Sequence, residues 1–231
     1  KPHEVFAANA ELEAAPEDMC GLLHLNEPTL LHATAKRAAF GATYTWVGAS
    51  QLLSVNPCEP VEGGEQLMTF FRNKTREIGE AEPHAYAVAE AACARLHRQR
   101  RVAVLVSGES GAGKTEASRL VVQYLVWRAA HTEARSAAHA ADNARAGKLR
   151  EGVLASNTVL ESLGNARMVA NANSSRFGKH VLLLVEPASS ADSPISLRGA
   201  EIECFLLERC RLCAIAPAER NFHALYYLLA A

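Results

Sequence analysis

Apolar residues in the first hundred positions recur in short groups separated by polar and turn-forming residues. Groups at three- and four-residue spacing predict helices, and brief apolar runs predict strands. The expected elements are helices over residues 19–23, 30–39, 65–72 and 83–96, and strands over residues 43–47 and 52–55. Asn56 and Pro57 end the second strand, because proline supplies no backbone N–H to a strand ladder and restricts the residue before it.

A continuous apolar run over residues 102–106 comes directly before a glycine-rich turn. Such a run is typical of a strand that is buried on both faces of a parallel sheet. After the turn, apolar residues at helical spacing predict a helix over residues 117–125. This stretch therefore predicts a unit of strand, tight turn and helix.

The remainder of the chain also mixes helical and strand patterns. Residues 129–150 are rich in Ala, Arg, His and Asp and carry no apolar stripe, so they are expected to form an exposed, mobile loop. Further elements are expected as helices over residues 153–163 and 219–229 and strands over residues 180–185, 195–197 and 201–207. Helices interleaved with apolar strands predict an α/β fold in which helices flank a mixed, largely parallel sheet.

Composition adds limits to this picture. The chain has 231 residues, of which 49% are hydrophobic, and a formal net charge of -1. A chain of this kind can bury a sizeable core, but it has no global field that would attract nucleic acid or an acidic membrane surface. It contains no apolar run of the roughly 18 residues that a membrane-spanning helix needs and no secretory leader pattern. A cytoplasmic protein without a nucleic-acid partner is expected, and both chain ends are expected to be cuts.

Six cysteines are scattered along the chain and are expected to be reduced thiols. Cys210 and Cys213 have the C-x-x-C spacing of some metal and redox sites. Their surroundings favour a strand, in which residues three apart point to opposite faces. A structural role is therefore expected for both.

The glycine-rich turn over residues 108–115, GESGAGKT, fits the phosphate-binding pattern G-x-x-x-x-G-K-[ST]. We call this segment the glycine loop. Its glycines allow backbone N–H groups to point at phosphate oxygens, and the following helix adds partial positive charge. Lys114 is expected to reach the outer phosphates, and the Thr115 hydroxyl is expected to join a Mg²⁺ shell. The alternative is a glycine turn that matches this pattern by coincidence.

A second polar stretch over residues 171–179, NANSSRFGK, lies between an expected helix and strand. We call this segment the polar loop. Its amides and hydroxyls suit a loop that folds over a terminal phosphate. Ser175 can bind Mg²⁺, Asn171 and Ser174 can contact phosphate or position a water molecule, and Arg176 can pair with a carboxylate. An ordinary surface turn is the alternative.

Together the two loops resemble the phosphate loop and switch I of myosin motor heads. Kinesins also place Ser-Ser-Arg near the phosphate, but without the Phe-Gly-Lys that follows here. Further pieces resemble myosins in the same order: LNEP at 25–28, VNP at 55–57, PHAYA at 83–87, LESLGN at 160–165, LLER at 206–209 and ERNFH at 219–223.

The resemblance implies a P-loop NTPase-type fold, an incomplete motor domain, ATP and Mg²⁺ as ligands, and actin-based movement in the longer protein. Catalytic roles are implied for Lys114, Asn171, Ser174 and Arg176. Metal contacts are implied for Thr115 and Ser175. Implied nucleotide contacts are Asn56, Pro57, Gly108, Glu109, Ser110, Gly111, Ala112, Gly113, Lys114, Thr115, Glu116, Asn171, Asn173, Ser174 and Ser175.

Under this resemblance the whole chain is part of one motor domain. The implied segments are an N-terminal region up to the adenine-side loop, a helix–strand–glycine-loop–helix region, an exposed loop beside the nucleotide, a region with the polar loop, and closing strands with a helix. These correspond to residues 1–60, 83–128, 129–150, 151–186 and 187–231. Actin is the implied partner, light chains are a further one, and the cytoskeleton is the implied location.

Departures from the myosin pattern leave alternatives open. Cys58 and Glu59 follow Asn56-Pro57 where myosins usually carry an aromatic residue and a lysine. No switch II sequence is present, so the chain alone is expected to be weakly active or inactive, and Arg176 is expected to pair with a switch II carboxylate. A degenerate nucleotide-binding scaffold or regulatory module is the main rival, and a small-molecule kinase is a more distant one.

Overall fold

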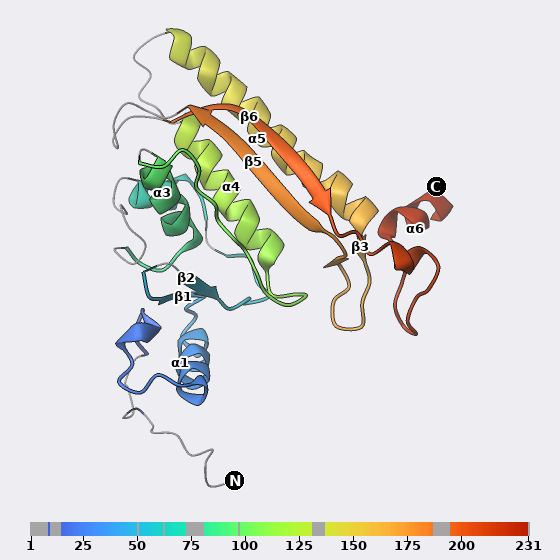
Figure 1. The fold of residues 1–231 in the computed structure, drawn as a ribbon, viewed down its shortest axis with the longest axis horizontal. Coiled ribbons are helices and arrows are strands. Elements are labelled where there is room, and N and C mark those ends of the chain that lie inside the picture. Colours follow the sequence, from blue (N-terminus) through green and yellow to red (C-terminus); the bar gives the residue numbers. More distant parts are fainter. Residues whose placement is uncertain are drawn as a thin grey trace. The chain divides into compact units, whose positions relative to one another are not determined.

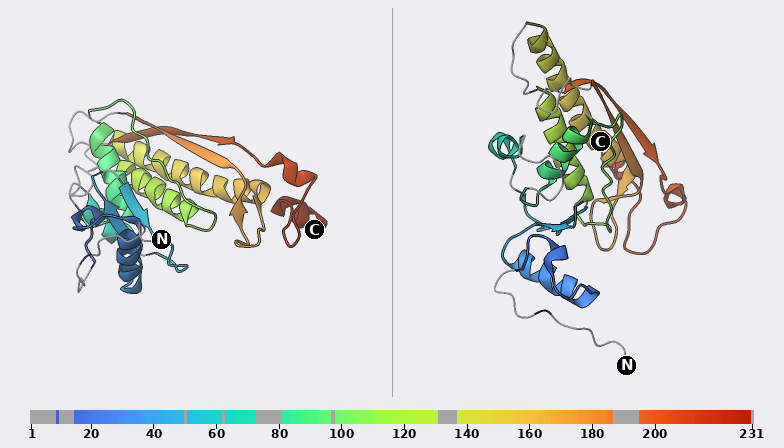
Figure 2. Two further views of the ribbon diagram at one scale, coloured as in Figure 1. Left: turned by 60° about the horizontal axis from the view of Figure 1, so that its bottom comes forward. Right: turned by 60° about the vertical axis from the view of Figure 1, so that its left-hand side comes forward.

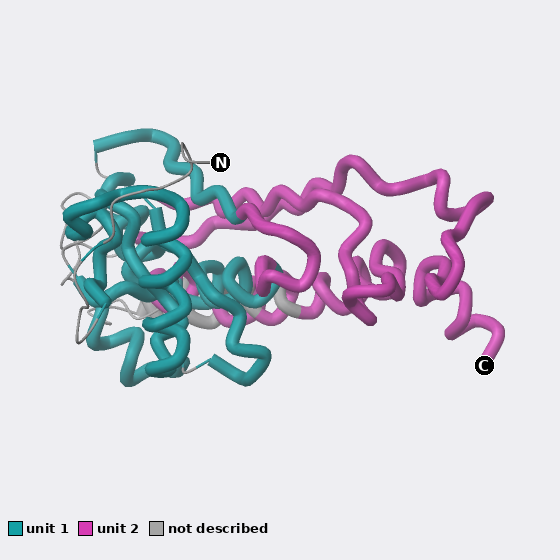
Figure 3. The backbone as a smooth tube through the Cα atoms, turned by 90° about the horizontal axis from the view of Figure 1, so that it is seen from below, with its two compact units in different colours: residues 1–106, 115–124 teal, residues 107–114, 125–231 magenta. Residues whose placement is uncertain are grey.

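The computed structural model describes residues 9, 15–49, 51–61, 63–72, 81–96, 98–130, 137–186 and 195–230. The chain divides into two compact units, which are coloured separately in Figure 3. Unit 1 comprises residues 1–106 and 115–124, and unit 2 comprises residues 107–114 and 125–231. Each unit is described by itself.

Unit 1 begins with a short 3-10 helix, η2 (Met19–Gly21), and the helix α1 (Glu27–Ala39). The α1 helix starts three residues earlier than its apolar pattern predicts, because Asn26 and Thr29 form a reciprocal capping box. The Asn26 side chain accepts from the Thr29 backbone N–H at 3.1 Å, and the Thr29 hydroxyl accepts from the Asn26 N–H at 3.2 Å.

Two predicted strands of unit 1 are confirmed as β1 (Tyr44–Val47) and β2 (Gln51–Ser54). They pair in antiparallel register, with Trp46 opposite Leu52. Two helices follow, α2 (Glu65–Phe71) and α3 (Ala85–Leu96), in agreement with the sequence pattern. Figure 1 labels β1, β2 and α3.

The core of unit 1 includes a cluster of buried aromatic side chains. Residues 115–124 of the helix α4 (Lys114–Ala130) contribute to this core. Tyr86 and Tyr124 are fully buried with ring centroids 5.2 Å apart, and the Tyr124 hydroxyl donates to Glu90 Oε2 at 2.8 Å. That bond gives the buried carboxyl group a polar partner, which burial requires.

Unit 2 is built from a long helix, α5 (Ala137–Gly164), and a hairpin of β5 (Gly178–Glu186) and β6 (Ser196–Phe205). Figures 1 and 2 show α5 lying along this hairpin, and α5 contacts β6. The hairpin is antiparallel, with a register shift between Leu184 and Val185.

Shorter elements complete unit 2. The strands β3 (Asn165–Ala166) and β4 (Ser174–Ser175) form a small antiparallel pair. A 3-10 helix, η3 (Arg209–Leu212), and the helix α6 (His223–Ala230) follow β6. The α5 helix ends at Gly164, as the sequence predicts. The helix predicted after the glycine loop is also present, as α4.

The predicted buried strand over residues 102–106 is wrong for this structure. These residues have no regular secondary structure, and the Leu105 side chain is 90% exposed. The sheets among the described residues are three antiparallel pairs. A parallel strand is stable only between neighbouring strands, and no described segment pairs with residues 102–106, so their apolar character alone does not make a strand.

Three other predictions need correction. The expected loop over residues 129–150 is largely helical, because α4 continues to Ala130 and α5 starts at Ala137; residues 131–136 lie outside the described part. Ala, Arg, Lys and Glu favour helix even without an apolar stripe.

The strands expected over residues 195–197 and 201–207 are one strand, β6. The helix expected over residues 219–229 begins only at His223.

The strand expected around Cys210 and Cys213 is also wrong, because these residues lie in and directly after η3. Residues three apart lie on the same side of a 3-10 helix, so the opposite-face argument does not hold. Both thiols are free and exposed. Across the described residues there is no group of three or more His, Cys, Asp or Glu side chains that could hold a metal ion.

Candidate nucleotide-binding site

The glycine loop forms a tight turn that leads directly into α4. The Ala112 N–H donates to the Glu109 carbonyl at 3.2 Å, which closes the turn. Gly111 and Gly113 have φ angles of 84° and 88°. Side-chain-bearing residues rarely adopt this left-handed region, so both positions require glycine.

Lys114 is the first residue of α4, and its side chain folds back over the glycine loop. Its ammonium group donates to the carbonyl oxygens of Gly108 and Glu109, at 2.7 Å each. An ammonium group has three donors, so two are occupied by the loop itself. A phosphate group that binds here would exchange carbonyl oxygens for phosphate oxygens around the same cation.

The polar loop meets the glycine loop within unit 2. The Ser110 and Ser174 hydroxyl oxygens lie 2.7 Å apart, although 64 residues separate them in sequence. The Asn171 side-chain amide lies close to Gly111, since its Nδ2 atom would be 3.7 Å from a Cβ added there. The structure therefore brings residues 110–111 of the first loop against residues 171 and 174 of the second.

Backbone pairing fixes the middle of the polar loop. Ser174 and Ser175 form β4 and pair with Ala166 and Asn165 in β3. Between the strands, the Met168 N–H donates to the Asn171 carbonyl at 2.8 Å. The first part of the polar loop thus belongs to a short hairpin that follows α5, and its two serine hydroxyl groups lie on the second strand of that hairpin.

Asn173 joins this hairpin to α6. Its side-chain oxygen accepts from Asn165 Nδ2 at 2.9 Å and lies 3.1 Å from His223 Nε2. Its backbone N–H donates to Asn171 Oδ1 at 2.9 Å. In this arrangement Asn173 supports Asn171 rather than reaching toward the glycine loop.

Ser175 is suited to a metal ion by the way its hydroxyl is bonded. This side chain is exposed, and its Oγ donates to the Phe177 carbonyl at 3.1 Å. The proton is thereby directed to the backbone, while the oxygen lone pairs stay available. Hard cations such as Mg²⁺ take oxygen ligands of this kind, so Ser175 fits the metal role that its sequence implies.

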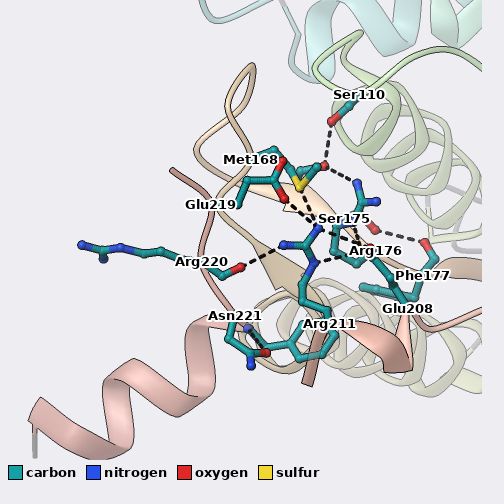
Figure 4. Close-up of polar contacts among 12 residues, drawn as sticks. Ser110, Met168, Ser175, Arg176, Phe177, Glu208, Arg211, Glu219, Arg220 and Asn221 are labelled. Carbon is teal, nitrogen blue, oxygen red and sulfur yellow. Dashed lines mark hydrogen bonds and ion pairs between the residues drawn. The ribbon is translucent and has the colours of Figure 1, made fainter. Parts of the chain in front are cut away.

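Arg176 pairs with a carboxylate inside this chain (Figure 4). Its Nε donates to Glu208 Oε2 at 2.6 Å, and its Nη1 donates to Ser174 Oγ at 3.3 Å. Within this chain Glu208 is the partner of Arg176, and the expected switch II partner stays a prediction. Arg176 therefore connects the Ser110–Ser174 contact to the segment after β6.

Glu208 is held as an anion. Hydrogen bonds from Arg211, and then from Arg176, lower the pKa of its carboxyl group below the ordinary value of 4.5. Arg211 also bonds Glu219, so two guanidinium groups alternate with two carboxylates (Figure 4). Sequence reasoning missed this network, because Glu208 and Glu219 served there only as parts of family signatures. The one available signal was the clustering of charges over residues 208–220.

Four implied nucleotide residues belong to unit 1: Asn56, Pro57, Thr115 and Glu116. Asn56 and Pro57 lie exposed after β2, and the Asn56 side chain accepts from the Cys58 N–H at 3.0 Å. Thr115 is exposed in the first turn of α4. Arg119 hydrogen-bonds Glu116 and lowers the pKa of its carboxyl group.

A glycine loop that opens a helix and contacts a second polar loop defines a phosphate-loop type of protein. The profile of the family "Myosin head (motor domain)" matches residues 16–231, and the chain therefore belongs to the myosin head family. This match confirms the resemblance drawn from the two loops. None of the described helices has the length and apolar character to cross a membrane.

Similarity to individual proteins agrees with this family assignment. The chain is 37% identical to Myosin-8 of Arabidopsis thaliana over 238 residues, which cover 100% of this chain and 14% of that protein. It is 41% identical over 218 residues to Protein OPAQUE1 of Zea mays, covering 93% and 13%. For Myosin-2 of Saccharomyces cerevisiae the identity is 36% over 225 residues, covering 96% and 14%. The chain thus spans about one-seventh of the relatives it matches.

Proposed function

We propose that this chain carries the Mg-ATP-binding part of an actin-based myosin motor, in which ATP hydrolysis drives movement. The observation that carries the proposal is the contact between Ser110 and Ser174, because it joins two loops whose side chains suit a triphosphate. The family membership supports a motor. Since the chain spans about 14% of its relatives, the activity and partners of the longer protein are part of the proposal.

In this proposal the residues of the glycine loop bind the phosphates. Their backbone N–H groups and the Lys114 ammonium bind phosphate oxygens, as preorganised donors do in phosphoryl transfer. Thr115 and Ser175 hold Mg²⁺, which when bound offsets phosphate charge. Asn171 and Ser174 position the attacking water molecule.

The adenine side and the remaining partners belong to the same proposal. Asn56 and Pro57 contact the base, and Cys58 with Glu59 alters that contact relative to other myosins. In the longer protein the proposed partner is the actin filament, bound through parts of the head largely outside these residues, and light chains are a further candidate partner. A cytoplasmic, cytoskeletal location and a largely parallel sheet are proposed for the complete head.

Replacing Lys114 tests the nucleotide assignment in the protein that carries this chain. Lys114→Ala should abolish binding of a fluorescent ATP analogue, because the loop loses its only side-chain cation. Lys148→Ala, an exposed lysine on α5, is the matched control and should bind normally. Undiminished binding by Lys114→Ala would refute the assignment.

A nucleotide-binding scaffold without a motor cycle is the second candidate. It is favoured by the altered residues after Asn56-Pro57. Actin-accelerated ATP hydrolysis in single-turnover experiments would exclude this candidate. Tight binding of ATP without actin acceleration would favour it over the motor.

A further inference from the structure

Arg211 is a buried arginine that no sequence motif singles out. Its side chain is 4% exposed and lies in η3, after the β5–β6 hairpin. A buried guanidinium group is tolerated only when its donors are paired. Its contacts therefore show what it holds in place.

The Arg211 donors are shared among separate segments of unit 2 (Figure 4). Nε donates to Glu208 Oε2 at 2.9 Å, and Nη2 lies 3.1 Å from Glu219 Oε2. Nη1 donates to the Arg220 carbonyl at 3.0 Å. Nη2 also lies 3.0 Å from Met168 Sδ, and so contacts the stretch that precedes the polar loop.

Glu208 links Arg211 to the polar loop. Its Oε2 atom accepts from Arg211 and from Arg176, and its backbone N–H donates to the Arg176 carbonyl at 2.9 Å. Its other oxygen lies 3.3 Å from Arg211 Nη2. The carboxylate thus lies between two guanidinium groups, and in this arrangement Arg176 Nη1 reaches Ser174 Oγ.

We propose that Arg211 is a positioning residue for the nucleotide site, acting through Glu208 and Arg176 on the hydroxyl of Ser174. The inference rests on the proposed function, because its consequence is the geometry of the two loops around Mg-ATP. Without Arg211, Glu208 has a single partner and can turn away from Arg176. The polar loop then closes less often over the glycine loop.

The planar fork of Arg211 is needed for this role. Its Nε and Nη2 face both oxygens of Glu208, while Nη1 and Nη2 reach two other segments, at residues 219–220 and at Met168. A lysine keeps the charge, but its single ammonium cannot span these acceptors. Arg211→Lys therefore separates geometry from charge.

A double-mutant cycle in the protein that carries this chain tests the proposal. The variants are Arg211→Lys, Arg176→Ala and their combination, with Mg-ATP affinity measured by a fluorescent ATP analogue. Arg211→Lys alone should weaken binding on the order of tenfold, within the range of coupled neighbours. In the Arg176→Ala background, Arg211→Lys should weaken binding by less than about a further twofold, because the arginine through which Arg211 acts on Ser174 is already absent.

Two further variants provide a second test and a control. Glu208→Gln removes the shared negative charge but leaves Arg211 bonded to Glu219, and it should show the same loss and the same non-additivity. It replaces Arg211→Lys in the cycle if that variant does not fold. Arg198→Lys, in the exposed Arg198–Glu186 pair of the hairpin, is the control and should bind like wild type.

The outcomes separate this inference from the proposed function. Additive losses, with the full effect kept in the Arg176→Ala background, would overturn the positioning role, since a merely structural effect does not depend on Arg176. Wild-type affinity in both Arg211→Lys and Glu208→Gln would overturn it as well. If the wild-type protein binds no Mg-ATP, or if Lys114→Ala binds it normally, the proposed function fails and the inference fails with it.

Discussion

The hydroxyl oxygens of Ser110 and Ser174 lie 2.7 Å apart, and this contact joins a glycine-rich turn to the second strand of a short hairpin. Arg176 donates to the same Ser174 oxygen, so Ser174 can direct its own proton toward Ser110. Loss of either hydroxyl would remove this bond between the loops. The contact therefore predicts which substitutions change nucleotide binding and which do not.

Ser110→Ala removes the hydroxyl contact while keeping the backbone of the glycine loop. A hydrogen bond of this kind contributes about 1 kcal/mol, so Mg-ATP affinity should fall roughly fivefold. Titration with a fluorescent ATP analogue measures the change. Ser162→Ala is the control, because its hydroxyl bonds the Val159 carbonyl within α5. Equal affinities for the two variants would show that the loop contact has no effect on binding.

Gly111→Ala tests the backbone of the glycine loop. The added methyl group has room, since its nearest neighbour is Asn171 Nδ2 at 3.7 Å, but the φ angle of 84° disfavours alanine. Alanine in this conformation costs about 1–2 kcal/mol of conformational free energy. The variant should therefore have a distorted loop and bind ATP more weakly. Calorimetric unfolding together with nucleotide titration would detect both effects.

Gly152→Ala provides the matched comparison. Gly152 lies within α5, and a Cβ there meets no atom within 4 Å. Alanine is favoured over glycine inside a helix by about 1 kcal/mol, so this variant should be slightly more stable and bind ATP normally. A Gly111→Ala protein that behaves like Gly152→Ala would argue against a strained phosphate-binding turn.

How much of this structure follows from the sequence depends on the range of the interactions involved. The glycine loop is predictable because its conformation depends on local residues: glycines tolerate φ angles of 84° and 88°, and a helix follows. The polar loop is recognisable by its residue types. The strand expected over residues 102–106 is not predictable from its own apolar run, because a parallel strand depends on neighbours elsewhere in the chain.

The Arg211 network escapes sequence reasoning for a related reason. A charged residue is expected at the surface, and burial of Arg211 depends on acceptors at Met168, Glu208, Glu219 and Arg220. Those positions meet only after the hairpin and η3 are in place. The partner of Arg176 is unpredictable for the same reason, because Glu208 lies 32 residues further along the chain.

Acid should weaken the link between Glu208 and its two arginines. Because the folded-state pKa of Glu208 lies below its ordinary value of 4.5, its ionised form contributes stability that is fully present above pH 4.5. This contribution is lost as the pH falls through the lowered folded-state value. The difference in unfolding free energy between wild type and Glu208→Gln should therefore shrink as the pH falls below 4.5.

Denaturant unfolding at a series of pH values measures that difference. Other carboxyl groups with lowered pKa values, such as Asp18 and Glu116, titrate in both proteins and cancel in the comparison. A difference that stays constant from neutral pH to pH 3 would contradict an ionised, paired Glu208.

The magnesium dependence of ATP affinity tests most directly whether the two loops form one site. Ser175→Ala should reduce the affinity measured with Mg²⁺ toward the value that wild type shows in the presence of a chelator, while Ser162→Ala keeps the full magnesium effect. This result is predicted because the Ser175 oxygen directs its lone pairs away from its bond to Phe177. An undiminished magnesium effect in Ser175→Ala would contradict a shared nucleotide and metal site.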